Sequence, residues 1–250
     1  EISVVENVRR KELQAEQLAE GIIKAMKDTQ MAEVSGKKKN KSKAVVRIEN
    51  GKDWTMFSGD CCERIKEVVS DSVGLSVFSP PFASLYKYSD SDHDMGNSRD
   101  YAEFFTHFEF LIPEILRATM PGRLCAVHCQ DLTTSKVGDG YIGKRPFSND
   151  ILDAFRRHGW IFASRITIDK NPQAQAIRTK AKTLMFIQKN KDSSWSWPAL
   201  ADYLLIFQKP GENQNPVHTD VSNEEWIRLA HPVWYDIEES DTLNARAARE

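Results

Sequence analysis

The chain has 250 residues, enough for one large domain or for a domain with an appendage. Hydrophobic residues make up 40% of it and charged residues 28%, and the net charge of -2 excludes the global basic field that attracts nucleic acids. Any contact with nucleic acid must therefore use local basic patches. No stretch approaches the roughly 20 apolar residues of a membrane-spanning helix, so we expect a cytoplasmic protein with no membrane partner.

The four cysteines have spacings that fit neither a secreted disulfide framework nor a zinc ribbon. Cys61 and Cys62 are adjacent, and Cys125 and Cys129 fall on one predicted strand. Reduced thiols of a cytosolic protein are the simplest interpretation. The Asp-His-Asp segment at 92–94 is typical of a solvated polar loop, and we expect no metal centre.

The first 43 residues are predicted to form an appendage to the main domain. Apolar residues recur at helical spacing over residues 4–28, which predicts an amphipathic helix. The lysine-rich segment 35–43 is either a solvated linker or a basic arm that touches phosphates, and a domain boundary is expected there. Residue 1 is Glu and residues 241–250 close no core element, so we expect both ends to be cuts in a longer polypeptide.

From residue 44 onward, strand and helix patterns alternate. Short apolar runs predict strands at 54–58, 73–78, 123–129, 160–168 and 203–208, and helical spacing predicts helices at 61–69, 100–120, 148–158 and 222–230. Asp100 is expected to cap the second helix, and Pro121-Gly122 to end it. Two long polar loops, 83–99 and 130–147, each follow a strand. This alternation predicts an α/β domain with a mostly parallel sheet over residues 44–210.

The segment Ser79-Pro80-Pro81-Phe82 directly follows the predicted strand 73–78. Two consecutive prolines end the strand and make a stiff loop at its carboxyl end, where open α/β sheets place their ligands. The loop presents a hydroxyl from Ser79, a carbonyl from Pro80 and an aromatic face from Phe82. These groups suit a flat ring that bears an amino group.

Gly59-Asp60-Cys61, the apolar strand and the Ser79–Phe82 motif together resemble the DNA amino-methyltransferases, over about residues 52–210. The resemblance implies a Rossmann-like methyltransferase sheet, mostly parallel, with a closing antiparallel hairpin that residues 181–185 and 202–209 resemble. It also implies transfer of a methyl group from S-adenosylmethionine to cytosine N4 or adenine N6 in double-stranded DNA, with a lean toward cytosine. Residues 211–250 would then begin a target-recognition or connecting region.

The same resemblance implies roles for the motif residues. Ser79 and the carbonyl of Pro80 would accept hydrogen bonds from the two N–H groups of the amino group, and Pro81 would stiffen the turn. Phe82 would stack on a base flipped out of the duplex. Asp60 and Cys61, with Ser79, would contact the cofactor. Asp60 has a second interpretation, as the N-cap of the helix that follows.

Candidate contacts to nucleic acid lie in the two loop regions after the sheet. Tyr86 and Tyr88 either line the pocket and contact the strand or are ordinary loop aromatics. Some of the basic residues are expected to contact phosphates: Lys136, Lys144, Arg145, Arg178 and Lys180. Trp195 and Trp197 either stack on bases or pack the loop. His128, at a strand end, is interpreted as a satisfied core residue.

One family feature is missing, because the chain has no Phe-x-Gly-x-Gly segment for the cofactor. The glycines at 138–143 are a weak substitute. Some members of the family are circularly permuted, and this chain has their order, so we expect the Gly-rich half beyond residue 250 or on another chain. Two alternatives stay open: a catalytically incomplete nucleic-acid-binding fragment, or a methyltransferase that acts on RNA or protein. Fusion to further domains and a phage or restriction-modification context are also expected.

Overall fold

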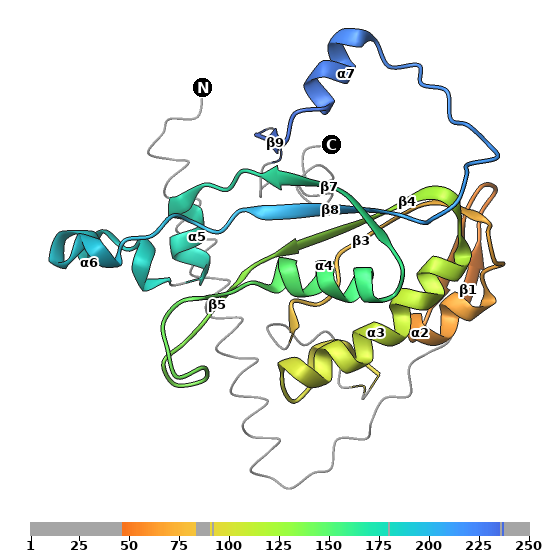
Figure 1. Cartoon of the computed structure of the whole chain (residues 1–250). Helices are drawn as coiled ribbons and strands as arrows, with labels where there is room; N and C mark the ends of the chain where they lie inside the picture. The colour runs from red at the N-terminus through yellow and green to blue at the C-terminus, as the bar shows by residue number, and fades with distance from the viewer. Residues whose placement is uncertain (1–46, 84–90, 92, 180, 236, 238–250) are drawn as a thin grey trace, which may run out of the picture. The chain divides into compact units, whose positions relative to one another are not determined.

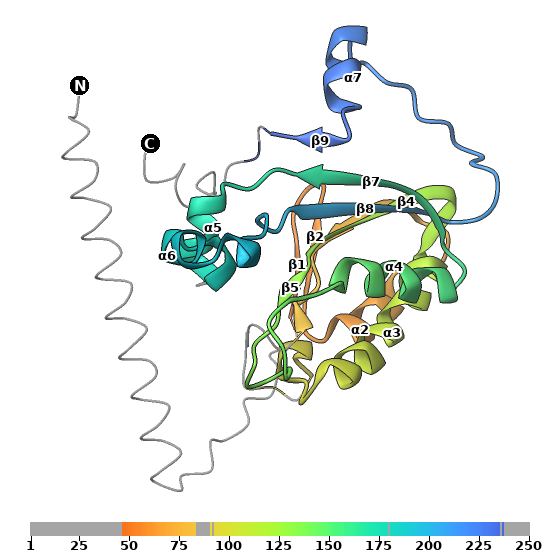
Figure 2. The same ribbon diagram turned by 60° about the vertical axis from the view of Figure 1, so that its left-hand side comes forward.

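The computed structural model describes residues 47–83, 91, 93–179, 181–235 and 237, shown in two views in Figures 1 and 2. The predicted helix over 4–28, the basic segment 35–43 and the predicted cut ends lie outside these residues. The predicted domain limits at 43 and 210 stay predictions. Within the described residues, no helix is both long enough and apolar enough to cross a membrane.

The central sheet has five strands: β3 (Val73–Phe78), β4 (Thr119–Gln130), β7 (Ile161–Ile168), β8 (Asp202–Gln208) and β9 (Val233–Trp234). Their order across the sheet is β3-β4-β8-β7-β9. The pairs β3 with β4 and β7 with β9 are parallel, whereas β8 is antiparallel to both of its neighbours. Four strands therefore point one way and β8 alone the other. This confirms the predicted α/β class with a mostly parallel sheet.

Smaller elements surround the sheet. Two short antiparallel pairs join β1 (Arg47–Asn50) to β2 (Thr55–Ser58) and β5 (Leu132–Thr133) to β6 (Lys144–Arg145). The longer helices are α3 (Tyr101–Ala118) and α4 (Phe147–Arg157). The shorter ones are α2 (Cys61–Arg64), η1 (Ile65–Glu67), η3 (Met95–Asn97), α5 (Pro172–Thr179), η4 (Lys182–Leu184), α6 (Phe186–Lys191), η5 (Ser193–Trp195) and α7 (Asn223–Leu229).

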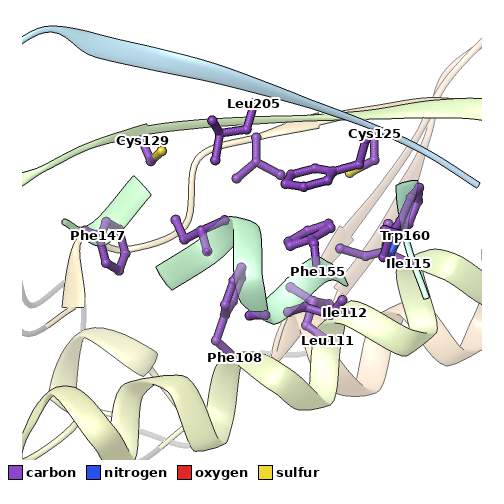
Figure 3. Packing of buried hydrophobic residues seen from close by; sticks show 14 of the residues in the cluster. Phe108, Leu111, Ile112, Ile115, Cys125, Cys129, Phe147, Phe155, Trp160 and Leu205 are labelled. Atoms are coloured by element: carbon purple, nitrogen blue, oxygen red, sulfur yellow. The ribbon is translucent and has the colours of Figure 1, made fainter. Parts of the chain in front are cut away.

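The helices α3 and α4 cover one face of the sheet and form the core with it (Figure 3). Phe155 of α4 is fully buried, and its ring stacks on that of Phe207 of β8 with centroids 4.2 Å apart. On β4, alternate residues point to this face: Cys125, Val127 and Cys129. The residues between them therefore point to the opposite face of the sheet, and His128 is one of these.

Several predicted elements needed correction. Asp100 caps α3 as predicted, with its carboxylate accepting from the Glu103 N–H at 2.8 Å, but the helix ends at Ala118 and not at Pro121-Gly122. Pro121 and Gly122 lie inside β4, in an irregular stretch where the β3–β4 register shifts. Such a bulge tolerates a proline that a regular central strand would not. Pro121-Gly122 therefore interrupts the strand pairing and does not end the helix.

The closing hairpin was also predicted imperfectly. The antiparallel pair exists as β7 and β8, but a long segment containing α5 and α6 joins these strands in place of a tight turn. Residues 182–184, predicted to resemble a hairpin strand, form the 3₁₀ helix η4. The strands β1 and β9 were not predicted, because strands of four and two residues carry almost no periodicity.

Candidate functional site

The strand register brings three distant polar residues to one end of the sheet. Phe78, the last residue of β3, pairs with Val127, so Ser79 lies level with His128 on β4. His128 pairs with Leu204, and Asp202 lies two residues along β8 on the same face. The carboxyl ends of β3 and β4 therefore meet the amino end of the antiparallel β8.

These residues form a continuous chain of hydrogen bonds. The Nδ1 atom of His128 lies 3.2 Å from the Ser79 hydroxyl, and its Nε2 atom lies 3.0 Å from Oδ2 of Asp202. Gln130 donates its amide to Oδ1 of Asp202 at 2.7 Å, and the Lys170 ammonium lies 3.0 Å from Oδ2. The Asp202 side chain is only 9% exposed, whereas that of His128 is 34% exposed. The carboxylate is thus fixed inside the protein, and the imidazole reaches the surface.

The environment keeps Asp202 ionised. Burial alone would raise the pKa of this carboxyl, but the hydrogen bonds from His128 and Lys170 outweigh burial and hold the pKa below its ordinary value. An ionised carboxylate only accepts hydrogen bonds, so Nε2 of a neutral His128 carries the ring proton. Its Nδ1 atom then offers a lone pair to the O–H of Ser79, and the lone pairs of the Ser79 oxygen remain available to an incoming donor.

The motif itself forms a tight turn. The Ala83 N–H donates to the Pro81 carbonyl at 2.9 Å, and Ala83 has a φ of 51°, a region that non-glycine residues rarely occupy. Pro80 is buried, and Ser79 is exposed. The ring of Phe82 is half-buried, with its centroid 6.1 Å from the rings of both His128 and Phe147. Strained backbone of this kind clusters at functional sites, which makes this turn a candidate for a functional role.

A cavity of about 560 Å³ opens beside the motif, between β2, α2, β3 and α3. Its volume lies within the usual range of small-molecule sites. Ser79 and Pro80 line it together with Cys61 and largely apolar side chains, among them Phe57, Ile65 and Met95. The cavity can therefore receive a flat, mostly apolar group next to the Ser79 hydroxyl.

Asp60 acts as the N-cap of α2, one of its two predicted roles. Its Oδ1 atom accepts from the Cys62 N–H at 2.9 Å, and its Oδ2 atom lies 2.8 Å from Nδ1 of His93. Cys61 is exposed, and the hydrogen bond from the neighbouring Cys62 thiol lowers the pKa of the Cys61 thiol. Contact of Asp60 or Cys61 with a cofactor stays a prediction.

Only some of the residues predicted to contact nucleic acid lie within the part of the chain that the structure describes. Tyr86, Tyr88 and Lys180 lie outside the described residues, as does the side chain of Arg178. Lys136 is exposed on the loop between β5 and β6. The other two have partners within the chain: Lys144 donates to the Pro198 carbonyl at 2.9 Å, and Arg145 pairs with Asp139 at 2.7 Å and stacks over Tyr101. Their contact with phosphates stays a prediction.

The glycines at 138–143 form the tip of the β5–β6 loop. The carboxylate of Asp139 accepts from the Ser135 N–H at 2.7 Å and pairs with Arg145. The Asp139 carboxylate thus accepts a hydrogen bond from within the loop and stabilises the loop's own turn. Trp195 and Trp197 stack on each other with centroids 6.2 Å apart, so each already has an aromatic partner.

Comparison with solved structures finds the same architecture in DNA methylases. TTHA0409 of Thermus thermophilus, a candidate DNA modification methylase in complex with S-adenosyl-L-methionine, superposes with a TM-score of 0.56 at 21% identity, over 76% of this chain and 70% of that one. The cytosine-N4-specific PvuII DNA methyltransferase gives 0.51 at 16% identity, over 84% and 65%. This chain shares their fold. No protein-family profile and no curated protein matches the sequence.

Of the hydrogen-bond chain Ser79–His128–Asp202 and its partners Gln130 and Lys170, the sequence indicated a functional role only for Ser79. His128 was interpreted as a core residue, yet it lies on the face opposite the core and contacts Ser79. Asp202 was predicted only as the first residue of a hairpin strand, and Lys170 was given no role. The available signal was that each is a polar residue at the end of an apolar strand, which is where an α/β sheet collects its functional groups.

Proposed function

We propose that this chain is an S-adenosylmethionine-dependent methyltransferase that acts on an exocyclic amino group of a base in double-stranded DNA, cytosine N4 or adenine N6. The observation that carries the proposal is the position of Ser79–Phe82 at the carboxyl end of β3, beside an apolar cavity. The fold supports it, since it is shared with a methylase complexed with S-adenosylmethionine and with a cytosine-N4-specific enzyme.

The motif suits the difficulty of this reaction. The lone pair of an exocyclic amine is delocalised into the ring, so the nitrogen is a poor nucleophile until it becomes more tetrahedral. Two acceptors aimed at its N–H bonds favour that change, and we assign this role to the Ser79 oxygen and the Pro80 carbonyl. Phe82 would pack against the ring of the flipped base, whose extrusion costs about a few kcal/mol.

The cavity fits the apolar part of the proposed cofactor. S-adenosylmethionine supplies an electrophilic methyl group on a sulfonium. The side chains of Phe57, Ile65 and Met95 offer an apolar surface for its adenine ring, and Cys61 lies in the same wall. Because the chain lacks a Phe-x-Gly-x-Gly segment, we propose that a further Gly-rich segment, in the permuted order, completes the site.

A second candidate function is suggested by the hydrogen-bond chain itself. Ser79, His128 and Asp202 are the residue types of a serine hydrolase, arranged as nucleophile, base and orienting acid. Such an enzyme also needs backbone N–H donors for the oxyanion. The two residues after Ser79 are prolines, which have no N–H. The structure therefore favours Ser79 as a hydrogen-bonding group over Ser79 as a nucleophile.

Methyl transfer tests the proposal directly. The chain, together with the Gly-rich segment proposed to complete its site, is incubated with S-adenosylmethionine labelled in its methyl group and with unmethylated duplex DNA of mixed sequence, and the digested nucleosides are identified by mass spectrometry. Label in N4-methylcytosine or N6-methyladenine is expected, and Ser79→Ala and Phe82→Ala should abolish it. Phe110→Ala is the matched control, because Phe110 is 65% exposed on α3 and should leave transfer unchanged.

Other outcomes point elsewhere. Label in RNA or protein but not in DNA would replace the proposed substrate. Covalent labelling of Ser79 by a fluorophosphonate probe, together with ester hydrolysis that Ser79→Ala removes, would establish the hydrolase instead.

A further inference from the structure

We propose that His128, held by Asp202, is the proton acceptor of this site and takes, through the Ser79 hydroxyl, the proton that the amino group must lose. The inference rests on the proposed methyl transfer and adds two residues to it. His128 lies 49 positions along the chain from Ser79, and Asp202 lies 74 positions from His128. It assigns a chemical role to His128 and Asp202, which lie next to the Ser79–Phe82 motif.

The task arises from the reaction itself. When the amine nitrogen forms its bond to the methyl carbon, the bond from carbon to sulfur breaks and its electron pair stays on sulfur. The nitrogen then carries a positive charge and one proton too many. That proton passes to the Ser79 oxygen while the Ser79 hydroxyl proton passes to Nδ1 of His128. The products are a methylated neutral amine, a neutral serine and an imidazolium, so atoms and charge balance.

The geometry provides each link of this path. The proton on Ser79 has an acceptor at 3.2 Å, and the imidazolium that forms keeps a carboxylate at 3.0 Å from its other nitrogen. Asp202 cannot swing away, because Gln130 and Lys170 hold its two oxygens. A hydrogen-bonded carboxylate fixes the ring orientation and stabilises its protonated form, as an orienting acid does for a catalytic histidine.

The position of His128 argues against a purely structural role. A second histidine of the chain, His158, also pairs with a carboxylate, that of Glu109 at 3.2 Å, but it links α4 to α3 away from the motif. His128 instead faces Ser79, is 34% exposed, and its ring lies 6.1 Å from that of Phe82, which we propose packs against the base. The charged groups packed with it are Asp202 on β8 and Lys170 after β7.

The first experiment measures the single-turnover rate of methyl transfer to duplex DNA in full-length variants. His128→Gln should lower this rate about 10²–10⁴-fold, the usual share of acid–base catalysis, while the KM values for DNA and S-adenosylmethionine change little. Asp202→Asn should lower it less. His158→Gln is the matched control and should transfer methyl groups at the wild-type rate.

A second measurement needs no turnover. Nitrogen NMR of histidine-labelled protein, with the His128 signal assigned by its loss in His128→Gln, should show the ring proton on Nε2, and Asp202→Asn should disturb that tautomer. A proton on Nδ1 would overturn the inference whatever the activity. A fully active His128→Gln beside an inactive Ser79→Ala would also overturn it while leaving the methyltransferase intact. Absence of transfer by the wild-type protein would instead defeat the proposed function.

Discussion

Removal of the Phe155 ring tests whether the stack between α4 and the sheet stabilises this fold. The side chain is fully buried, and its ring lies 4.2 Å from that of Phe207, 5.7 Å from that of Trp160 and 6.2 Å from that of Phe108. It therefore contacts α3, β8 and the residue that precedes β7; Phe155, Phe108 and Trp160 are labelled in Figure 3.

Truncation to alanine loses both the buried ring and its three aromatic neighbours. Buried Phe→Ala changes cost about 3–5 kcal/mol, and we expect Phe155→Ala to fall in the upper half of that range because the stack with Phe207 adds to the area lost. At about 2–4 °C per kcal/mol for a chain of this size, the melting temperature should fall by about 8–20 °C. Phe155→Leu, which keeps apolar volume, should lose about 1–2 kcal/mol.

Urea unfolding measures the difference. Circular dichroism follows the helices, and Trp160 serves as a nearby fluorescent reporter. Phe110→Ala provides the control, because Phe110 on the same protein is 65% exposed and its truncation should change stability by less than about 0.5 kcal/mol. A loss below about 1.5 kcal/mol for Phe155→Ala at an unchanged m-value, or an equal loss for Phe110→Ala, would refute the reasoning.

Three further predictions concern other parts of the molecule. Alkylation at neutral pH should modify Cys61 first, because this thiol is exposed and its pKa is lowered, whereas burial raises the pKa of Cys125 and Cys129 to about 12. Peptide mass spectrometry gives the order of labelling, and early labelling of Cys125 in the folded protein would contradict the prediction. Gly122→Ala should destabilise the fold by about 1–3 kcal/mol in urea, because Gly122 has a φ of +72° and a Cβ there would lie 2.7 Å from the Asn213 backbone nitrogen. The pKa of Asp202 is lower in the folded chain than its ordinary 3.8, so its contribution to stability is complete above pH 3.8 and is lost as the pH falls below that value. Asp202→Asn should therefore make stability depend less on pH below 3.8 in acid unfolding followed by circular dichroism. An unchanged acid-unfolding curve would argue against the pairing of Asp202.

The elements that could be predicted are those whose signal is local. The strand Val73–Phe78 was predicted with both ends correct, because its apolar run stops at two prolines. The helix Asn223–Leu229 has the capping box of Ser222 and Glu225 at its start, within a few consecutive residues. The end of α3 could not be predicted in the same way. Pro121-Gly122 is read locally as a helix stop, and only the partner strand β3 reveals that it occupies a bulge.

The residues of the candidate site also differ in whether a local sequence signal identifies them. Ser79–Phe82 is contiguous, so the sequence alone identifies it. His128 becomes a neighbour of Ser79 through the parallel pairing of β3 with β4. Asp202 joins them only because β8 lies antiparallel between β4 and β7, and no local pattern records that strand order. His128 and the basic loop residues were therefore interpreted one at a time, as a core residue and as phosphate contacts.

Strand register links the core to the proposed chemistry. In β4, Cys129 points into the core and His128 points away from it, and in β8, Leu205 is buried while Asp202 faces His128. Because side chains alternate along a strand, a slip of one residue in the β4–β8 pairing would turn one partner of the His128–Asp202 pair toward the wrong face. The apolar residues that hold the register thus also hold the hydrogen-bond chain. Weakening of the core near β8 should consequently disturb the Ser79–His128–Asp202 hydrogen bonds before it unfolds the chain.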